Sequence, residues 1–341
     1  MKYVILLKPN GNIPFFEELK KMCMYEAAIV FNRLKLETSD LKVIKIGKAD
    51  YLQFECSKQL DDQLINYISR LSFYYSMFEV KEEGLYKPID LINESYLGED
   101  LSVRLKYQGK TNERFTRMLM NTALFSTPYY NASHINILDP MCGKGTSLFE
   151  ALIAGYNGLG VEQNKTAINE LSTYFKRYLQ EGKYKHEVLN GKAQDNGKTI
   201  GEVFEVNVAK TKKEAKDKTG KKLKILRGDT CDAHKFFKKN SVHVIVTDLP
   251  YGVKHIGKSG GESVRNLESL LDEAFKSWYQ LLKHNGAVAL SWNTYTNKRE
   301  VLQTLLESNG FKVLDDENYV NFDHRVSQAI NRDIIIGIKI K

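Results

Sequence analysis

The chain has 341 residues, 42% of them hydrophobic and 27% charged, a composition typical of globular proteins and long enough for a large and a small domain. No stretch approaches the ~20 consecutive apolar residues of a membrane-spanning helix, and the apolar run behind Met1 is too short for a signal peptide. The four cysteines form no CxxC pair, so neither a zinc site nor a disulfide framework is indicated. We therefore expect a cytoplasmic protein without a metal or a membrane contact, whose net charge of +8 favours a polyanionic partner.

Residues 1–83 predict a small domain in which strands and helices alternate. The expected strands are 3–7, 43–46, 51–56 and 77–80, and the expected helices are 15–33 and 60–71. Both helices are predicted from apolar residues that recur every three or four positions. Strands and helices that alternate in so short a segment favour a ferredoxin-like α/β sandwich. Residues 84–110 carry few periodic apolar residues and are predicted to be a linker.

From residue 111 to residue 341 the strand–helix units become longer. The expected strands are 134–138, 158–161, 223–226, 242–247, 287–291, 311–314 and 333–340, and the expected helices are 145–154, 165–179, 267–282 and 299–308. This alternation predicts a Rossmann-like, doubly wound α/β domain. Ligands of such a domain bind at the carboxyl ends of the strands, so we expect the functional residues in the loops that follow them.

Residues 181–222 interrupt this alternation. Between residues 210 and 222 the chain carries seven lysines against Glu214 and Asp217. Residues 201–209 and 222–226 have strand-like composition, which favours a β-hairpin with a basic tip. The alternative is a solvated insertion without a function of its own.

A glycine-containing loop, Asp139-Pro140-Met141-Cys142-Gly143-Lys144-Gly145-Thr146, follows one expected strand and opens a helix. Glycines let the backbone approach a ligand closely, and the helix N-terminus offers N–H groups and the positive end of a dipole. Glu162 ends the next strand, where a carboxylate can accept hydrogen bonds from ribose hydroxyls. Asp229 follows a further strand and could accept a hydrogen bond from an adenine amine. The candidate cofactor residues are therefore Asp139, Pro140, Cys142, Gly143, Gly145, Thr146, Glu162 and Asp229.

A second loop, Asp248-Leu249-Pro250-Tyr251-Gly252, follows the apolar strand that ends at Thr247. Together the two loops resemble those of the S-adenosylmethionine (SAM)-dependent amino-methyltransferases, which carry [D/N/S]-P-P-[Y/F/W] at the second position. More narrowly, they resemble the guanosine-N2 tRNA methyltransferases and their THUMP-linked relatives. The resemblance covers roughly residues 105–341. Leu249 departs from the commoner Pro-Pro pair, and residues 1–110 suffice for only one small module rather than a complete THUMP domain.

The resemblance implies SAM as the cofactor and an exocyclic base amine as the methyl acceptor. Asp248 and the carbonyl of Leu249 or Pro250 would accept the amine N–H bonds, while proline fixes the local backbone. Tyr251 would stack on the extruded base. Phe115 and Thr116, upstream of the glycine loop, are expected at the methionine end of SAM by resemblance. Helix capping by Thr111 or Asn112 and core packing of Phe115 is the alternative explanation of that segment.

Basic residues near the catalytic loop and near the C-terminus are candidates for phosphate contacts. They are Lys254, His255, Lys258, Arg265, His324, Arg325 and Arg332. We expect a structured RNA as substrate, with guanine N2 of tRNA preferred and rRNA also open. A DNA adenine-N6 or cytosine-N4 methyltransferase would share the loop chemistry, although no large target-recognition domain is evident. A non-catalytic SAM-binding RNA protein is the remaining alternative.

Overall fold

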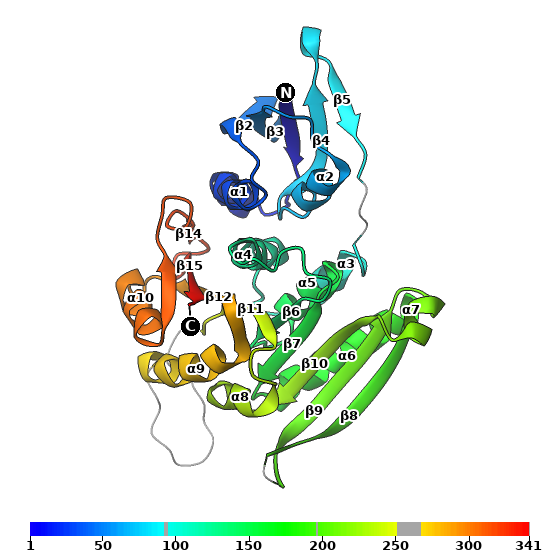
Figure 1. Ribbon diagram of the computed structural model, residues 1–341, viewed down its shortest axis with the longest axis vertical. Coiled ribbons are helices and arrows are strands. Elements are labelled where there is room, and N and C mark those ends of the chain that lie inside the picture. Colours follow the sequence, from blue (N-terminus) through cyan, green and yellow to red (C-terminus); the bar gives the residue numbers. More distant parts are fainter. Residues whose placement is uncertain (92–94, 196, 251–266, 341) are drawn as a thin grey trace. The chain divides into compact units, whose positions relative to one another are not determined.

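The computed structural model describes residues 1–91, 95–195, 197–250 and 267–340, and Figure 1 traces them. The chain divides into two compact units. One comprises Met1–Glu94 with Asp315–Ile334, and the other comprises Ser95–Leu314 with Ile335–Lys341. None of the helices in these described ranges is long and apolar enough to span a membrane.

The first unit contains an antiparallel sheet of β1 (Lys2–Leu7), β2 (Thr38–Ile46), β3 (Ala49–Cys56), β4 (Tyr74–Val80) and β5 (Tyr86–Ile89). Its strand order is β2-β3-β1-β4-β5. Helix α1 (Ile13–Arg33) follows β1, and helix α2 (Asp62–Ile68) follows β3. Leu19, Cys23, Ala27 and Val30 lie on the buried side of α1 at the spacing that predicted this helix. The order β2-β3-β1-β4 is that of a ferredoxin-like sandwich, and β5 extends it from within the segment predicted as a linker.

The second unit is built on a mixed sheet with the order β13-β15-β12-β11-β6-β7-β10-β9-β8 in the described part of the chain. Its parallel strands are β6 (Asn136–Asp139), β7 (Asn157–Glu162), β10 (Lys221–Arg227), β11 (Val242–Asp248) and β12 (Leu282–Asn293). β13 (Phe311–Leu314) is antiparallel to β15 (Asn331–Lys339), which also pairs with β14 (His324–Arg325). The chain runs outward from β6 to β10 and then returns to β11 and β12. The predicted Rossmann-like fold is thus confirmed, with its switch point between β6 and β11.

Helices cover this sheet through two separate apolar clusters. α5 (Thr146–Ile153) and α6 (Lys165–Glu181) pack with β9 (Lys198–Ala209) and β10 in one cluster, which includes Phe149, Phe175 and Phe204. α9 (Leu267–Leu281) and α10 (Arg299–Ser308) pack in the other, which includes Trp278 and Trp292. Helices on both faces of the parallel strands explain why the central strands β6 and β11 are buried along almost their whole length.

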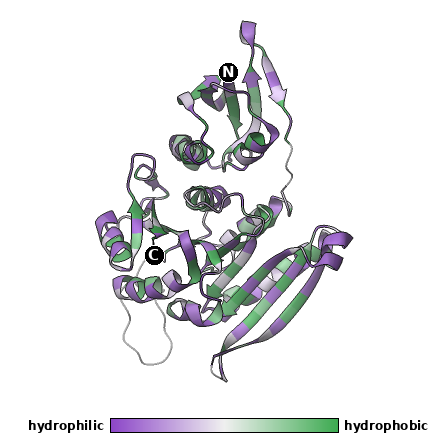
Figure 2. Cartoon of the chain, viewed as in Figure 1, coloured by the Kyte–Doolittle hydropathy of each residue, from purple (hydrophilic) through white to green (hydrophobic). Residues whose placement is uncertain are grey.

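The insertion after α6 forms two strands and a short helix. β8 (Lys185–Asp195) pairs with β9, and β9 pairs with β10, both in antiparallel register. The segments predicted as strands do pair, but the basic connection between them holds helix α7 (Lys212–Asp217). Hydrophilic and hydrophobic residues alternate along β9, as Figure 2 shows, and Phe204, Val206 and Val208 are its buried face.

The pairing register also places the two ends of this insertion. Val208 lies opposite Lys221, where β10 begins, so α7 and the lysine-rich segment lie at the amino edge of the parallel strands. The passage from β8 into β9 lies at the carboxyl edge, because β9 runs antiparallel to β10. The basic segment is therefore at the edge of the sheet that does not bind ligands.

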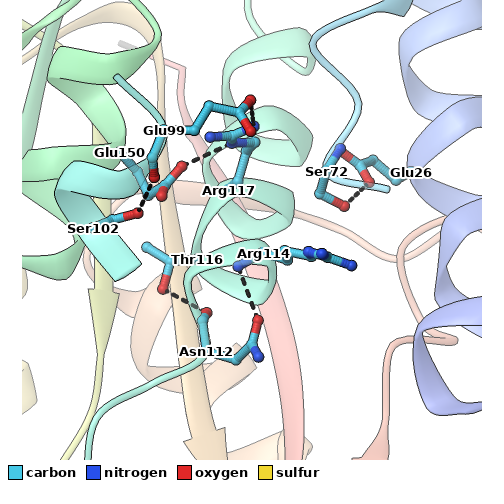
Figure 3. A network of polar contacts seen from close by, with 9 residues as sticks. All are labelled: Glu26, Ser72, Glu99, Ser102, Asn112, Arg114, Thr116, Arg117 and Glu150. Carbon is cyan, nitrogen blue, oxygen red and sulfur yellow. Dashed lines mark hydrogen bonds and ion pairs between the residues drawn. The ribbon is translucent and has the colours of Figure 1, made fainter. Parts of the chain in front are cut away.

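A buried ion pair holds the helix that precedes the glycine loop. Helix α4 (Glu113–Phe125) carries Arg117, whose Nε donates to Oε2 of Glu150 on α5 at 2.7 Å (Figure 3). Glu99 accepts a second hydrogen bond from Arg117 at 3.1 Å, just ahead of helix α3 (Asp100–Arg104). Burial acts to lower the pKa of Arg117, but the two carboxylates outweigh it and hold that pKa above its ordinary value. Arg117 therefore joins α4 to α5 with its charge retained.

We predict that Glu150→Ala lowers the free energy of unfolding of the second unit by about 3 kcal/mol, because it leaves the partly buried Arg117 guanidinium without its main, buried partner. Urea denaturation followed by circular dichroism measures this change. Glu99→Ala is the matched control, since its side chain is 44% exposed and the pair is worth less than about 1 kcal/mol. Equal losses in the two variants would contradict a buried, stabilising Arg117–Glu150 pair.

Candidate active site

Asp139 ends β6 and organises the loop that follows. Its Oδ1 accepts a hydrogen bond from the Met141 N–H at 3.0 Å, and its Oδ2 accepts one from the Ser147 hydroxyl at the start of α5. The side chain is buried, and burial raises the pKa of Asp139 to about 6 despite these hydrogen bonds. Asp139 thus connects the start of the loop, at Met141, to the first turn of α5, at Ser147.

The loop reaches α5 through two residues with left-handed backbones. Gly143 has φ +50° and Gly145 has φ +82°, a region that favours glycine. A Cβ at Gly145 would also lie 2.4 Å from Cδ1 of Leu171. Cys142, directly before Gly143, is buried, and burial raises the pKa of its thiol well above the ordinary value, as suits a packing residue rather than a nucleophile. At Gly143 the backbone of the loop therefore has open space next to it, at the carboxyl ends of the strands, where a ligand can approach.

Glu162 ends β7 and ties the glycine loop to the next helix. One of its carboxylate oxygens accepts the Gly143 N–H at 2.8 Å, and the other accepts the Asn164 N–H at 2.7 Å. Asn164 in turn caps α6 by accepting the N–H of Thr166 at 2.9 Å. The Glu162 carboxylate is consequently held at the strand end with lone pairs left for further donors.

Asp229 lies just beyond β10 and has a structural role. Its Oδ1 accepts the N–H of Cys231 at 2.9 Å and caps the 3₁₀ turn Thr230–Asp232. From the sequence, Asp229 was predicted to contact the cofactor. The capping bond uses one oxygen, so the other remains available to a ligand.

Asp248 ends β11 with both carboxylate oxygens engaged. Oδ1 accepts the hydroxyl of Ser291 at 2.7 Å, and Oδ2 accepts the hydroxyl of Thr111. Ser291 lies directly opposite Asp248 on β12 and is fully buried. Its carbonyl also accepts the Leu249 N–H at 2.8 Å. Ser291 therefore fixes both the carboxylate and the backbone of the residue after it.

Neither Ser291 nor Thr111 was predicted to orient Asp248. Ser291 belongs to no motif, and only strand register brings it beside the carboxylate. Thr111 was considered only as a helix cap, but Asn112 caps α4 by accepting the Arg114 N–H at 2.9 Å (Figure 3). Tyr107 was missed as well, and its hydroxyl lies 2.9 Å from that of Thr146 on α5. To predict these residues, one must know which strands and helices lie side by side, and hydrophobic periodicity does not reveal this.

One open pocket of about 1350 Å³ within the second unit brings these residues together. The predicted site residues that line it are Phe115, Thr116, Asp139, Pro140, Cys142, Gly143, Thr146, Glu162, Asp229, Asp248, Leu249 and Pro250. Gly145 is absent from the lining because it lies against Leu171. The side chain of Leu249 packs in the apolar core, so only its backbone can present a polar group.

Only some of the residues predicted to contact the substrate lie in the described part of the chain. Tyr251, Lys254, His255, Lys258 and Arg265 lie outside the described residues. Arg325 is exposed on β14 and belongs to the first unit. His324 and Arg332 are 2% and 5% exposed, and burial lowers the pKa of His324 to about 4. Both were predicted as candidates for phosphate contacts, a role that the burial of their side chains does not favour. In the described ranges no group of His, Cys, Asp and Glu side chains is suited to a metal ion.

Residues 131–326 match the model of a protein family, UPF0020, described as "RMKL-like, methyltransferase domain". This match covers more than half of the chain. A comparison of the chain with curated proteins found no match.

Three solved structures are reported as fold neighbours. TrmN from Thermus thermophilus is 14% identical with a TM-score of 0.43, and the alignment covers 88% of this chain and 59% of TrmN. The fibrillarin pre-rRNA processing protein of Methanococcus jannaschii is 12% identical with a TM-score of 0.36, over 89% of this chain and 84% of that one. Spermidine synthase from Thermotoga maritima is 13% identical with a TM-score of 0.39, over 69% and 61%. This chain therefore spans little more than half the length of TrmN.

We predict that Glu162→Ala weakens SAM binding about ten- to a hundredfold, because charge-assisted hydrogen bonds to ribose contribute roughly 1.5–3 kcal/mol. Titration calorimetry measures the dissociation constant, and circular dichroism checks that the variant is folded. Glu170→Ala is the control, since Glu170 pairs with Lys144 at the surface and lies outside the pocket lining. Unchanged affinity in folded Glu162→Ala would refute the ribose assignment.

Proposed function

The chain belongs to the RMKL-like methyltransferase family, and on that premise we propose that it methylates an exocyclic amine of an RNA base, with guanine N2 in tRNA as the target. Its cofactor is SAM. The observation that carries the proposal is the position of Asp248. Its carboxylate is oriented in the same pocket as the glycine loop and Glu162, and it is followed directly by Leu249 and Pro250.

The residues of the pocket suit the cofactor. Positive-φ glycines open the loop, and Glu162 holds two acceptor oxygens at the neighbouring strand end. Bound SAM supplies an electrophilic methyl group on a positively charged sulfur. Phe115, Thr116 and Thr146 line the same pocket and are the residues that would contact its methionine end.

The proposed role of Asp248 is to make the base amine, a poor nucleophile, able to attack the methyl group. The lone pair of an aromatic amine is delocalised into the ring, so the nitrogen attacks carbon poorly until the amine becomes pyramidal. A carboxylate that accepts one N–H bond and a backbone carbonyl that accepts the other favour that geometry. As the N–C bond forms, the methyl–sulfur bond would break with its electron pair kept by sulfur. The nitrogen gains positive charge beside the Asp248 carboxylate, which stabilises it and offers an acceptor for the departing proton.

RNA as the substrate class is supported by the resemblance of the Asp-Leu-Pro-Tyr loop to guanosine-N2 methyltransferases and by the net charge of +8. The lysine-rich segment 210–222 is not proposed to position the target base, because it lies at the opposite edge of the sheet from Asp248. Long-range attraction of a polyanion is the role that its location permits.

We predict that Asp248→Asn lowers the single-turnover rate of methyl transfer by on the order of a hundredfold or more, because it removes the charge that stabilises the transition state. Radiolabelled SAM and unmodified RNA measure the rate, and SAM affinity should change little. Asp272→Asn, an exposed residue of α9, serves as the control. Near-normal transfer by Asp248→Asn would disprove the amine mechanism.

Ser291→Ala extends the same test to the group that orients the carboxylate. Ser291 is buried and cannot touch the substrate, so it is a positioning residue. Its loss should lower kcat by about tenfold while the KM for RNA changes little, since misorientation affects the transition state more than binding. A change in KM alone would assign Ser291 a role in the fold or in binding instead.

The substrate class predicts a specific product. RNA from cells that lack the protein should lose a methylated guanosine that the purified enzyme restores in the presence of SAM. Nucleoside mass spectrometry of separated tRNA and rRNA identifies the base and the RNA. Methylation of genomic DNA with no change in either RNA would replace the RNA proposal with the DNA alternative.

A further inference from the structure

The β8–β9 hairpin continues past the edge of the sheet at which the pocket opens. The pairing of β9 with β10 ends at Val203, which lies opposite Leu226, so residues 198–202 lie beside and beyond the end of β10. Four of them, Thr199, Ile200, Gly201 and Glu202, line the same pocket as Asp248 and the glycine loop. The insertion therefore contributes a wall to a site that the rest of the domain builds from strand ends.

This wall lies against the segment that carries Asp229. A Cβ at Gly201 would lie 2.3 Å from the carbonyl oxygen of Arg227, so only a glycine lets β9 pass so close. The Phe236 ring lies close to both glycines. Its Cζ would lie 2.5 Å from a Cβ at Gly228, and its Cε1 would lie 3.4 Å from a Cβ at Gly201. Backbone contact and the Phe236 ring thus fix residues 199–202 beside the end of β10.

Glu202 connects the wall to both neighbouring elements. Its carboxylate lies 3.6 Å from the guanidinium of Arg227 and 3.9 Å from the Lys165 ammonium at the start of α6. These side chains are 41–59% exposed, so each pair contributes little to stability. They nevertheless place the hairpin next to Asn164, the cap of α6, and next to Glu162, the residue proposed at the ribose.

We propose that this segment of the insertion, with Ile200 at its centre, is part of the cofactor site and covers the adenosine moiety of SAM. The inference rests on the proposed cofactor pocket. With the ribose at Glu162 and the adenine amine at Asp229, the purine ring would lie near the end of β10, where strand register places Ile200, a residue of the pocket lining. A purine face is apolar and aromatic, and a branched aliphatic side chain packs well against it.

Ile200→Ala tests this with two probes, S-adenosylhomocysteine and 5′-methylthioadenosine, which share the adenosine and differ in the amino-acid end. Because Ile200 contacts only the shared part, its truncation should weaken both probes by the same factor, about tenfold in calorimetric dissociation constant. Leu189→Ala is the matched control, since this residue of β8 is 44% exposed and lies outside the pocket lining. It should leave both affinities unchanged.

Glu162→Ala separates failure of this inference from failure of the proposed site. If Glu162→Ala weakens both probes but Ile200→Ala binds them as the wild type does, the hairpin is not part of the cofactor site and the inference is overturned. A loss with S-adenosylhomocysteine alone overturns it too, because the contact would then lie at the amino-acid end. If neither variant changes binding, the pocket is not the cofactor site and the proposed function fails with the inference.

Discussion

The parallel register of β6, β7, β10 and β11 is the constraint on which the site depends. Parallel strands end at one edge of a sheet, so residues far apart in the chain meet there. Asp139 ends β6 and Asp248 ends β11, on either side of the switch point, while Glu162 ends β7 one strand further along. Each carboxylate stands at the last residue of its strand, and no long loop is needed to bring them together.

Hydrogen bonds then hold each carboxylate before any ligand arrives. A carboxylate taken from water is costly unless its oxygens accept hydrogen bonds. Asp139, Glu162 and Asp248 all use both oxygens, and their donors come from the loop, the next helix and the neighbouring strand. The same bonds that offset burial also fix the orientation of these groups, which is the requirement for electrostatic stabilisation of a transition state.

In the insertion, strand direction separates the two ends of one segment. Because β9 runs antiparallel to β10, the lysine-rich connection with α7 is carried to the amino edge of the sheet. The opposite end of β9, which includes Ile200 and Gly201, reaches the carboxyl edge and enters the pocket lining. The lysines are the most unusual feature of the insertion's composition, but strand register places the other end of β9, residues 199–202, beside the site.

The sequence by itself determined an N-terminal and a larger C-terminal α/β region, the glycine loop and the Asp248 loop, because apolar periodicity and turn residues act within a few positions of one another. It did not show that Asp315–Ile334 join the first unit. Tertiary structure alone decided that Ser291 and Thr111 bind Asp248, since they lie 43 and 137 residues away from it. It also decided that His324 and Arg332 are buried rather than exposed to a polyanion. Strand register and burial arise from contacts between distant segments, and a local pattern of residue types does not encode which segments will meet.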